Sequence, residues 1–221
     1  FHYSFRNAFN FLLVLSFLLI LLVIGQKPTN NNQTIGSNLA PIKFSDPCSK
    51  DQSYPCYRTA LTQYYGQVGI KPSLFTLTKL RQENTTVSYF CHSLAHDLGR
   101  TAYDQTKGDI GQIFTEGTTD CWSGFYHGAL EKAFSKSKDI VDTARNLCTE
   151  ENGVKGSFLS YQCLHGLGHG LSSRFDNEIF DALLICDRLN NSYQQSSCYG
   201  GVFMENFAAD NVNHFTKYLD T

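Results

Sequence analysis

The sequence predicts an all-α fold in which antiparallel helix pairs form a solenoid or a partial toroid behind an N-terminal transmembrane helix. Three observations predict it: a short motif that recurs behind four cysteines, an alternation of long and short segments with helical periodicity, and a long apolar run near the N-terminus. With 221 residues, 42% of them hydrophobic, the chain can form one sizeable core after that run.

The apolar run from 9 to 25 is long enough for a membrane-spanning helix, although a secretion signal has a similar core. No small-x-small cleavage site follows it, which favours an uncleaved anchor in 1–25 over a removed signal segment. The next stretch, 26–53, is rich in Asn, Thr, Ser and Pro and is expected to be a polar linker. The remainder, 54–221, is expected to be a helical-repeat domain, truncated at its C-terminus because no stop signal follows its last helix.

Within 54–221, helical periodicity begins at Pro55, and Pro72 is expected to open a second helix that stops near Asn84. Two kinds of segment then alternate, as expected for an inner and an outer layer of helices. The longer segments, which carry the recurring motif, are 86–107, 119–135, 157–175 and 192–212. The shorter ones are 109–115, 138–150 and 177–189.

The recurring motif is clearest at 163–170, Cys-Leu-His-Gly-Leu-Gly-His-Gly. Related blocks follow Cys91, Cys121 and Cys198, so together with Cys163 the four cysteines recur at intervals of 30, 42 and 35 residues, a period typical of stacked helix pairs. Each block has a small residue second, an apolar residue third and His or Met fifth. Five of the seven histidines fall inside the blocks, which points to chemistry there.

All eight cysteines follow the apolar run, and their even number predicts four disulfides in an oxidising compartment. The protein is therefore expected to be a single-pass protein of the cell membrane with its domain on the extracytoplasmic side. Three pairs are expected across short loops at helix ends: Cys48–Cys56, Cys148–Cys163 and Cys186–Cys198. Cys91 and Cys121 have no such partner and are left to join two successive inner helices.

This arrangement of cysteines resembles the cysteine-rich, disulfide-stapled secreted helical-repeat proteins of the tetratricopeptide-like class, over 48–210 and in architecture only. The Gly-rich His-Gly blocks are also faintly similar to lanthionine cyclases and related α/α toroids, whose inner helices begin with such segments and whose zinc is bound by Cys and His. Cysteine gaps of 15 and 12 residues depart from the first family, and disulfide bonding of the cysteines departs from the second. No binding residue is carried over from either.

The spacing of the histidines predicts a metal site. Three pairs of potential ligands lie four residues apart, so that each pair projects from one face of a helix: His92 and His96, His127 and Glu131, and His165 and His169. The repeat also aligns the fifth position of the four blocks at one level of the inner layer, occupied by His96, His127, His169 and Met204. Any two adjacent blocks could then share an ion.

Histidine with methionine suits copper or zinc, while Glu131 and Glu205 leave iron or manganese open. We therefore expect a His-rich inner face that binds a transition metal, in a metal-binding or redox role. One alternative is a non-enzymatic interaction module whose concave face binds a peptide or protein and whose histidines are structural. Another is an α/α-toroid hydrolase or lyase with His127 or His169 as general base, so enzymatic activity stays open.

The composition excludes nucleic-acid binding through a basic face, because the net charge is -2 and no cluster of Lys and Arg occurs. Large aromatic residues in and beside the blocks are predicted to pack in the inner layer: Trp122, Phe125, Tyr126, Phe158, Tyr161, Tyr199 and Phe203.

Overall fold

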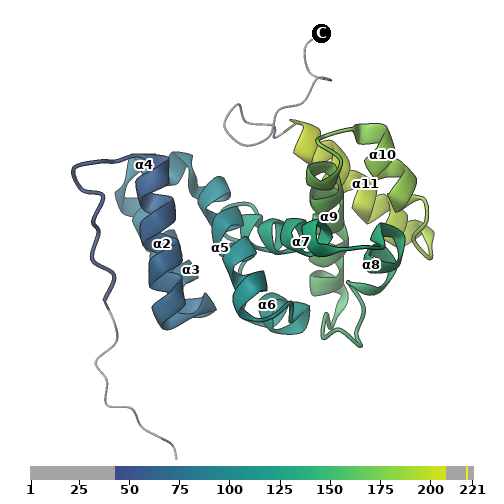
Figure 1. The fold of residues 1–221 in the computed structure, drawn as a ribbon, viewed down its shortest axis with the longest axis horizontal. Coiled ribbons are helices and arrows are strands. Elements are labelled where there is room, and N and C mark those ends of the chain that lie inside the picture. The colour runs from purple at the N-terminus through teal and green to yellow at the C-terminus, as the bar shows by residue number, and fades with distance from the viewer. Residues whose placement is uncertain (1–42, 208–217, 219–221) are drawn as a thin grey trace, which may run out of the picture. The chain divides into compact units, whose positions relative to one another are not determined.

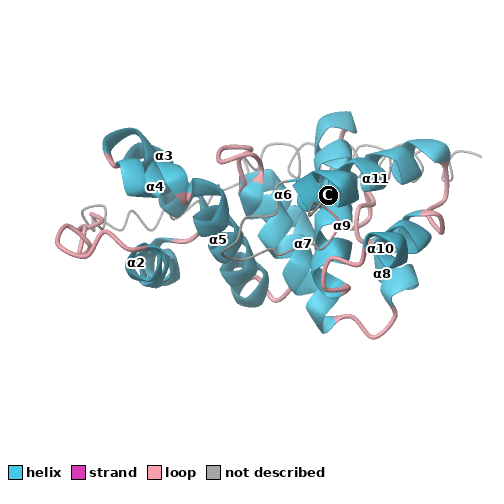
Figure 2. Cartoon of the chain, turned by 90° about the horizontal axis from the view of Figure 1, so that it is seen from above, coloured by secondary structure: helices cyan, strands magenta, loops and turns pink. Residues whose placement is uncertain are grey.

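The computed structural model describes residues 43–207 and Tyr218, and all regular structure within them is helical (Figures 1 and 2). This confirms the all-α prediction. The apolar run at 9–25, predicted to anchor the chain, and most of the predicted linker lie outside the described residues. No helix in the described part of the chain is long and apolar enough to cross a bilayer.

The helices follow the predicted alternation. Three helices precede the first motif: α2 (Tyr54–Val68), α3 (Ile70–Glu83) and α4 (Thr85–Tyr89). The long helices that carry the motif are α5 (Cys91–Gln105), α7 (Gly124–Lys136), α9 (Ser157–Arg174) and α11 (Ser192–Phe207). The short helices between them are α6 (Ile110–Glu116), α8 (Ile140–Asn146) and α10 (Ile179–Cys186).

Local sequence signals explain where the first helices begin and end. Ser53 caps α2 by accepting from the backbone N–H of Cys56, and Gly69, with φ of +78°, ends α2 and precedes α3. Pro72 lies in the first turn of α3, where a missing N–H costs nothing. The predicted segment 86–107 is divided at Phe90, which separates α4 from α5. The ring of Phe90 packs against that of Tyr54.

The long helices pack in series, α5 on α7, α7 on α9 and α9 on α11 (Figure 1). Two of these contacts bring backbones together at glycine. A Cβ atom on Gly128 of α7 would lie 2.0 Å from the carbonyl oxygen of His96 on α5, and one on Gly201 of α11 would lie 1.9 Å from that of His165 on α9. Both distances are far below van der Waals contact, so only glycine fits.

The contact between α7 and α9 is different, because side chains fill it. Gly166 and Gly170 of α9 lie against the side chains of Leu130 and Phe134 of α7. The structure is therefore built from two tight helix pairs, α5–α7 and α9–α11, that meet through a side-chain layer.

The four pairs of cysteines that the spacing predicts are the pairs joined in the structure: Cys48–Cys56, Cys91–Cys121, Cys148–Cys163 and Cys186–Cys198. The first bridge fixes the end of the predicted linker to α2, where Phe44 also packs edge-on against Tyr64. The described residues before α2 accordingly belong to the compact unit.

The prediction of a buried aromatic layer is right only in part. Phe125 and Tyr126 are buried, whereas Trp122 is 70% exposed and Phe158 is 59% exposed. Tyr161 and Phe203 also keep more than two fifths of their surface exposed. Where helix backbones touch at glycine, no space is left between the helices for aromatic rings. The large side chains therefore lie at the edges of the helix contacts, where they are exposed to solvent.

The close contact at Gly128 predicts a large effect of one methyl group. Gly128→Ala should lower the free energy of unfolding by ~1–3 kcal/mol, because the neighbouring backbone has to move. Gly66→Ala is the matched control: it is helical and exposed, its Cβ would lie 3.6 Å from a flexible Gln105 amide, and it should stabilise by ~0.5–1 kcal/mol. Urea unfolding of both variants measures the difference. Equal midpoints would contradict the packing described.

Candidate metal centre

Five histidines from three helices meet at the centre of the helix series. His92 and His96 come from α5, His127 from α7, and His165 and His169 from α9. They form two groups of three in which one ligand nitrogen per residue lies within 4.8 Å of the others. The first group is His92, His96 and His127, and the second is His127, His165 and His169. Because α7 lies between α5 and α9, His127 belongs to both.

The first group has both α5 histidines oriented by hydrogen-bond acceptors. Nδ1 of His92 lies 2.8 Å from the carbonyl oxygen of Cys121, which can only accept, so Nδ1 carries the proton. Nδ1 of His96 lies 2.7 Å from Oε1 of Glu131. The Nε2 atoms of His92 and His96 then both present lone pairs, and they face each other at 3.0 Å. Two such lone pairs repel unless a proton or a cation lies between them.

The second group has one histidine oriented in this way. Nδ1 of His169 contacts the carboxylate of Glu205 on α11, and Nε2 of His169 lies 3.2 Å from Nε2 of His165. His169 and Glu205 are both almost completely buried. A carboxylate that accepts from the outer nitrogen of a histidine fixes its tautomer and makes the inner nitrogen a better ligand.

His127 is the central residue and the one without partners. It is 1% exposed, and neither of its ring nitrogens has a hydrogen-bond partner among the described residues. Its ring stacks on that of His169, with centroids 3.8 Å apart, and lies edge-on to those of His92 and His96 at 5.5 Å. A buried polar group without a partner costs ~1–3 kcal/mol, so this ring needs an explanation.

The carboxylate of Glu131 is held by a chain of polar contacts that runs out to α2. Arg100 pairs with both Glu131 and Asp97, and the hydroxyl of Tyr54 donates to Asp97 over 2.5 Å. Burial alone would raise the pKa of Glu131, but His96 and Arg100 outweigh it and lower the pKa to about 2. Glu131 is therefore ionised at neutral pH and available as an acceptor for His96.

Three of the histidines, His92, His127 and His165, are held neutral. Burial, followed by the neighbouring His96, lowers the pKa of His92 to about 4, and burial together with His169 lowers that of His165 to about 4. Burial and the surrounding histidines lower the pKa of His127 well below its usual range. Neutral imidazole is the form that binds a metal ion.

A left-handed turn precedes His127. Cys121, Trp122 and Ser123 all have positive φ, between 53° and 61°, although none is glycine. Such a conformation costs ~1–2 kcal/mol per residue and persists only where the surrounding contacts enforce it. Here the turn points the Cys121 carbonyl at His92, and the Ser123 hydroxyl donates to Gln162 of α9 over 2.9 Å. The helix predicted to begin at 119 therefore begins at Gly124.

The structure brings together six of the seven residues that the sequence proposes as metal ligands. The five histidines can bind an ion directly, whereas Glu131 contacts the Nδ1 atom of His96. Met204 differs, because it is 48% exposed, whereas its neighbour Glu205 is buried and contacts His169. A shift of one residue turns a helical side chain by about 100°, so Met204 and Glu205 lie on different faces of α11. Glu205 could have been found from the sequence, because it lies four residues after Gly201 and therefore on the same face of α11, which meets α9. The repeat gave no indication that Arg100 and Tyr54 contribute to the site, because neither occupies a repeated position of the motif.

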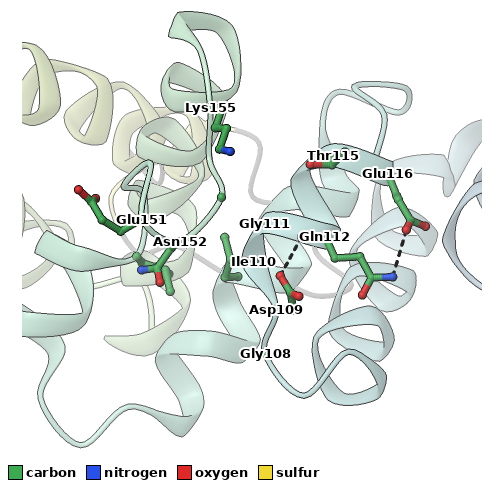
Figure 3. A pocket seen from close by; sticks show the side chains of 12 residues that line it. Gly108, Asp109, Ile110, Gly111, Gln112, Thr115, Glu116, Glu151, Asn152 and Lys155 are labelled. Atoms are coloured by element: carbon green, nitrogen blue, oxygen red, sulfur yellow. Dashed lines mark hydrogen bonds between the residues drawn. The ribbon is translucent and has the colours of Figure 1, made fainter. Parts of the chain in front are cut away.

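A cleft among the described residues lies elsewhere. It has a volume of about 750 Å³ and lies between α6 and the loop that follows α8, with Asp109, Glu151 and Lys155 among its lining residues (Figure 3). Its polar groups serve local structure: Asp109 caps α6 through the N–H of Gln112, whose side chain donates to Glu116. None of the five clustered histidines lines this cleft.

The lowered pKa values predict that the metal-free protein is less stable in mild acid. His92 and His165 have a pKa of about 4 when folded and about 6.5 when unfolded, so the unfolded chain takes up protons first as the pH falls. Stability should be fully present above pH ~6.5 and should be lost between there and pH ~4. Urea midpoints in the presence of a chelator at pH 7, 6 and 5 measure this. His165→Gln should make the dependence shallower, and an unchanged midpoint across the range would refute the assignment.

Comparison of the chain with protein-family models, with curated proteins and with solved structures finds no match. The function is therefore inferred from the geometry of the histidine cluster.

Proposed function

We propose that this protein binds a transition metal, zinc or copper, at the cluster of His92, His96, His127, His165 and His169. The observation that carries the proposal is the state of His127, a fully buried ring whose two nitrogens have no hydrogen-bond partner among the residues that the structure describes. Buried polar groups in folded proteins are satisfied, and an ion bound by His127 would satisfy it.

The distances within the cluster support the same conclusion. Two imidazole nitrogens bound to one tetrahedral ion, each at 2.0–2.1 Å, lie about 3.3 Å apart. The Nε2 atoms of His92 and His96 are 3.0 Å apart, and those of His165 and His169 are 3.2 Å apart. A cation between either pair could therefore be bound by both Nε2 atoms with little movement of the rings.

The ligand chemistry favours zinc or copper. The potential ligands are imidazoles, and Glu131 and Glu205 contact the Nδ1 atoms of His96 and His169, on the side away from the ion. Thiolate ligation is ruled out for all eight cysteines, which are bonded in disulfides.

We further propose that the domain lies outside the cytoplasm, anchored by the apolar run at 9–25. Four disulfides are typical of an oxidising compartment, and the run is long enough to span a membrane. The cluster would then meet metal ions at the cell surface or in an equivalent compartment.

Metal analysis of the purified chain tests the proposal. The chain should contain zinc or copper in stoichiometric amount, measured by elemental mass spectrometry after dialysis. His127→Ala should lower the metal content strongly, because both groups lose their common member. Glu151→Gln, an exposed change in the cleft of Figure 3, is the matched control and should retain the metal. A metal-free wild type that also binds neither ion on titration would leave the histidines structural and favour an interaction module.

The single tryptophan gives a second, independent measurement. Trp122 is the only tryptophan in the chain, and its ring centroid lies 6.4 Å from that of His92. Binding of Cu²⁺ at the cluster should therefore quench most of the Trp122 emission at stoichiometric concentration, and excess Zn²⁺ should restore it by competition. His92→Ala should weaken the quenching. Full emission after one equivalent of Cu²⁺ is bound would place the copper elsewhere.

A further inference from the structure

We propose that the cluster holds two metal ions, and that His127 bridges them as an imidazolate. This inference rests on the proposed metal-binding function and specifies its stoichiometry and its central ligand. One ion would be bound by His92, His96 and one nitrogen of His127. The other would be bound by His165, His169 and the second nitrogen of His127.

The division of the cluster into two groups supports two ions. Each group has three histidines within ligand distance, and His127 is the only residue that the groups share. The remaining histidines divide by helix, two on α5 and two on α9, with α7 packed between these helices. A ligand set of this kind has two centres, one on each side of His127.

The state of His127 supports a bridge. A neutral imidazole has one N–H donor and one acceptor, and the two nitrogens point in different directions from the ring. Neither finds a partner in the described residues, although the ring is 1% exposed. One bound ion would satisfy a single nitrogen and leave the other buried and unpaired. Two ions satisfy both, and they would lie about 6 Å apart across the ring at ordinary metal–nitrogen distances.

The carboxylates are also distributed one to a group. Glu131 contacts Nδ1 of His96 in the first group, and Glu205 contacts Nδ1 of His169 in the second. Both carboxylates are buried, with 6% and 2% of their surfaces exposed. A buried carboxylate behind a histidine ligand is the arrangement by which proteins orient the histidine and balance the charge of a cation. The pattern occurs twice, once for each proposed ion.

The protons balance in two steps. The first ion binds neutral His127 through one nitrogen, while the other nitrogen keeps its hydrogen. The second ion displaces that hydrogen as a proton, which leaves to solvent, and the negative charge of the imidazolate is shared by the two cations. No oxidant or reductant is needed.

The two sites should fill in order. His127 lies edge-on to His92 and His96, so their nitrogens can converge on one point. In the second group the rings of His127 and His169 stack with an interplanar angle of 14°, and the lone pairs of parallel rings do not converge. These rings have to turn apart before the second ion binds. The group on α5 should therefore bind the first ion, and the group on α9 the second.

Titration of the metal-free chain with Cu²⁺, followed by electron paramagnetic resonance, tests the bridge. The first equivalent should give a mononuclear signal of full intensity. The second should reduce the integrated intensity per copper ion, because two Cu²⁺ ions across an imidazolate couple antiferromagnetically. Binding that stops at one equivalent, or a second equivalent that adds a full uncoupled signal, would overturn the bridge and leave the proposed function standing. Absence of any binding would overturn both.

Three variants localise the effect. His127→Ala should abolish the coupling at every copper loading, even where ions still bind to the histidine pairs on α5 and α9. His92→Ala and His165→Ala are matched changes, one in each group, and each should leave one bound ion with an uncoupled signal. A coupled signal that survives in His127→Ala would exclude this ring as the bridge. Circular dichroism of each metal-free variant checks that its helices are intact.

Discussion

The arrangement of the site depends on the contact of helix backbones at glycine. Packed helices usually lie ~8–10 Å apart, and side chains fill the space between them. Here Gly128 and Gly201 allow the carbonyl groups of His96 and His165 to touch the neighbouring helix, and Gly99 and Gly168 make the reciprocal contacts. Each glycine costs the helix ~1 kcal/mol relative to alanine, a cost that close packing has to offset. The result is that histidines of different helices reach a common centre.

The same contacts explain why polar residues occupy the core. With the backbone of α5 touching α7 on one side and side chains filling the contact with α9 on the other, the space left around α7 is small and shaped by the histidine rings. Burying imidazoles and carboxylates is costly unless each finds a partner. Glu131 and Glu205 provide partners for His96 and His169, and Arg100 neutralises Glu131. The polar centre is thus a network at whose middle lies His127, with neither ring nitrogen hydrogen-bonded within the described part of the chain.

The sequence predicted most of this arrangement because its regularities are local. Alternation of segments gives the helices, the positions of the cysteines give their pairs, and the four-residue spacing of His92 with His96 and of His165 with His169 gives a shared face. Two features could be determined only from the three-dimensional structure. The register of α11 depends on where Gly201 meets α9, which placed Glu205 rather than Met204 at the site. The exposure of Trp122 depends on a left-handed turn, which the residue types at 121–123 do not predict because none of them is glycine.

That turn links disulfide formation to the metal binding proposed for the cluster. Cys121 holds α5 through its bond to Cys91, and its carbonyl fixes the ring of His92. A reduced chain has no such tether, and the unfavourable backbone at 121–123 would relax, leaving His92 free to rotate. The proposed metal binding by the first group would therefore depend on formation of the Cys91–Cys121 bond.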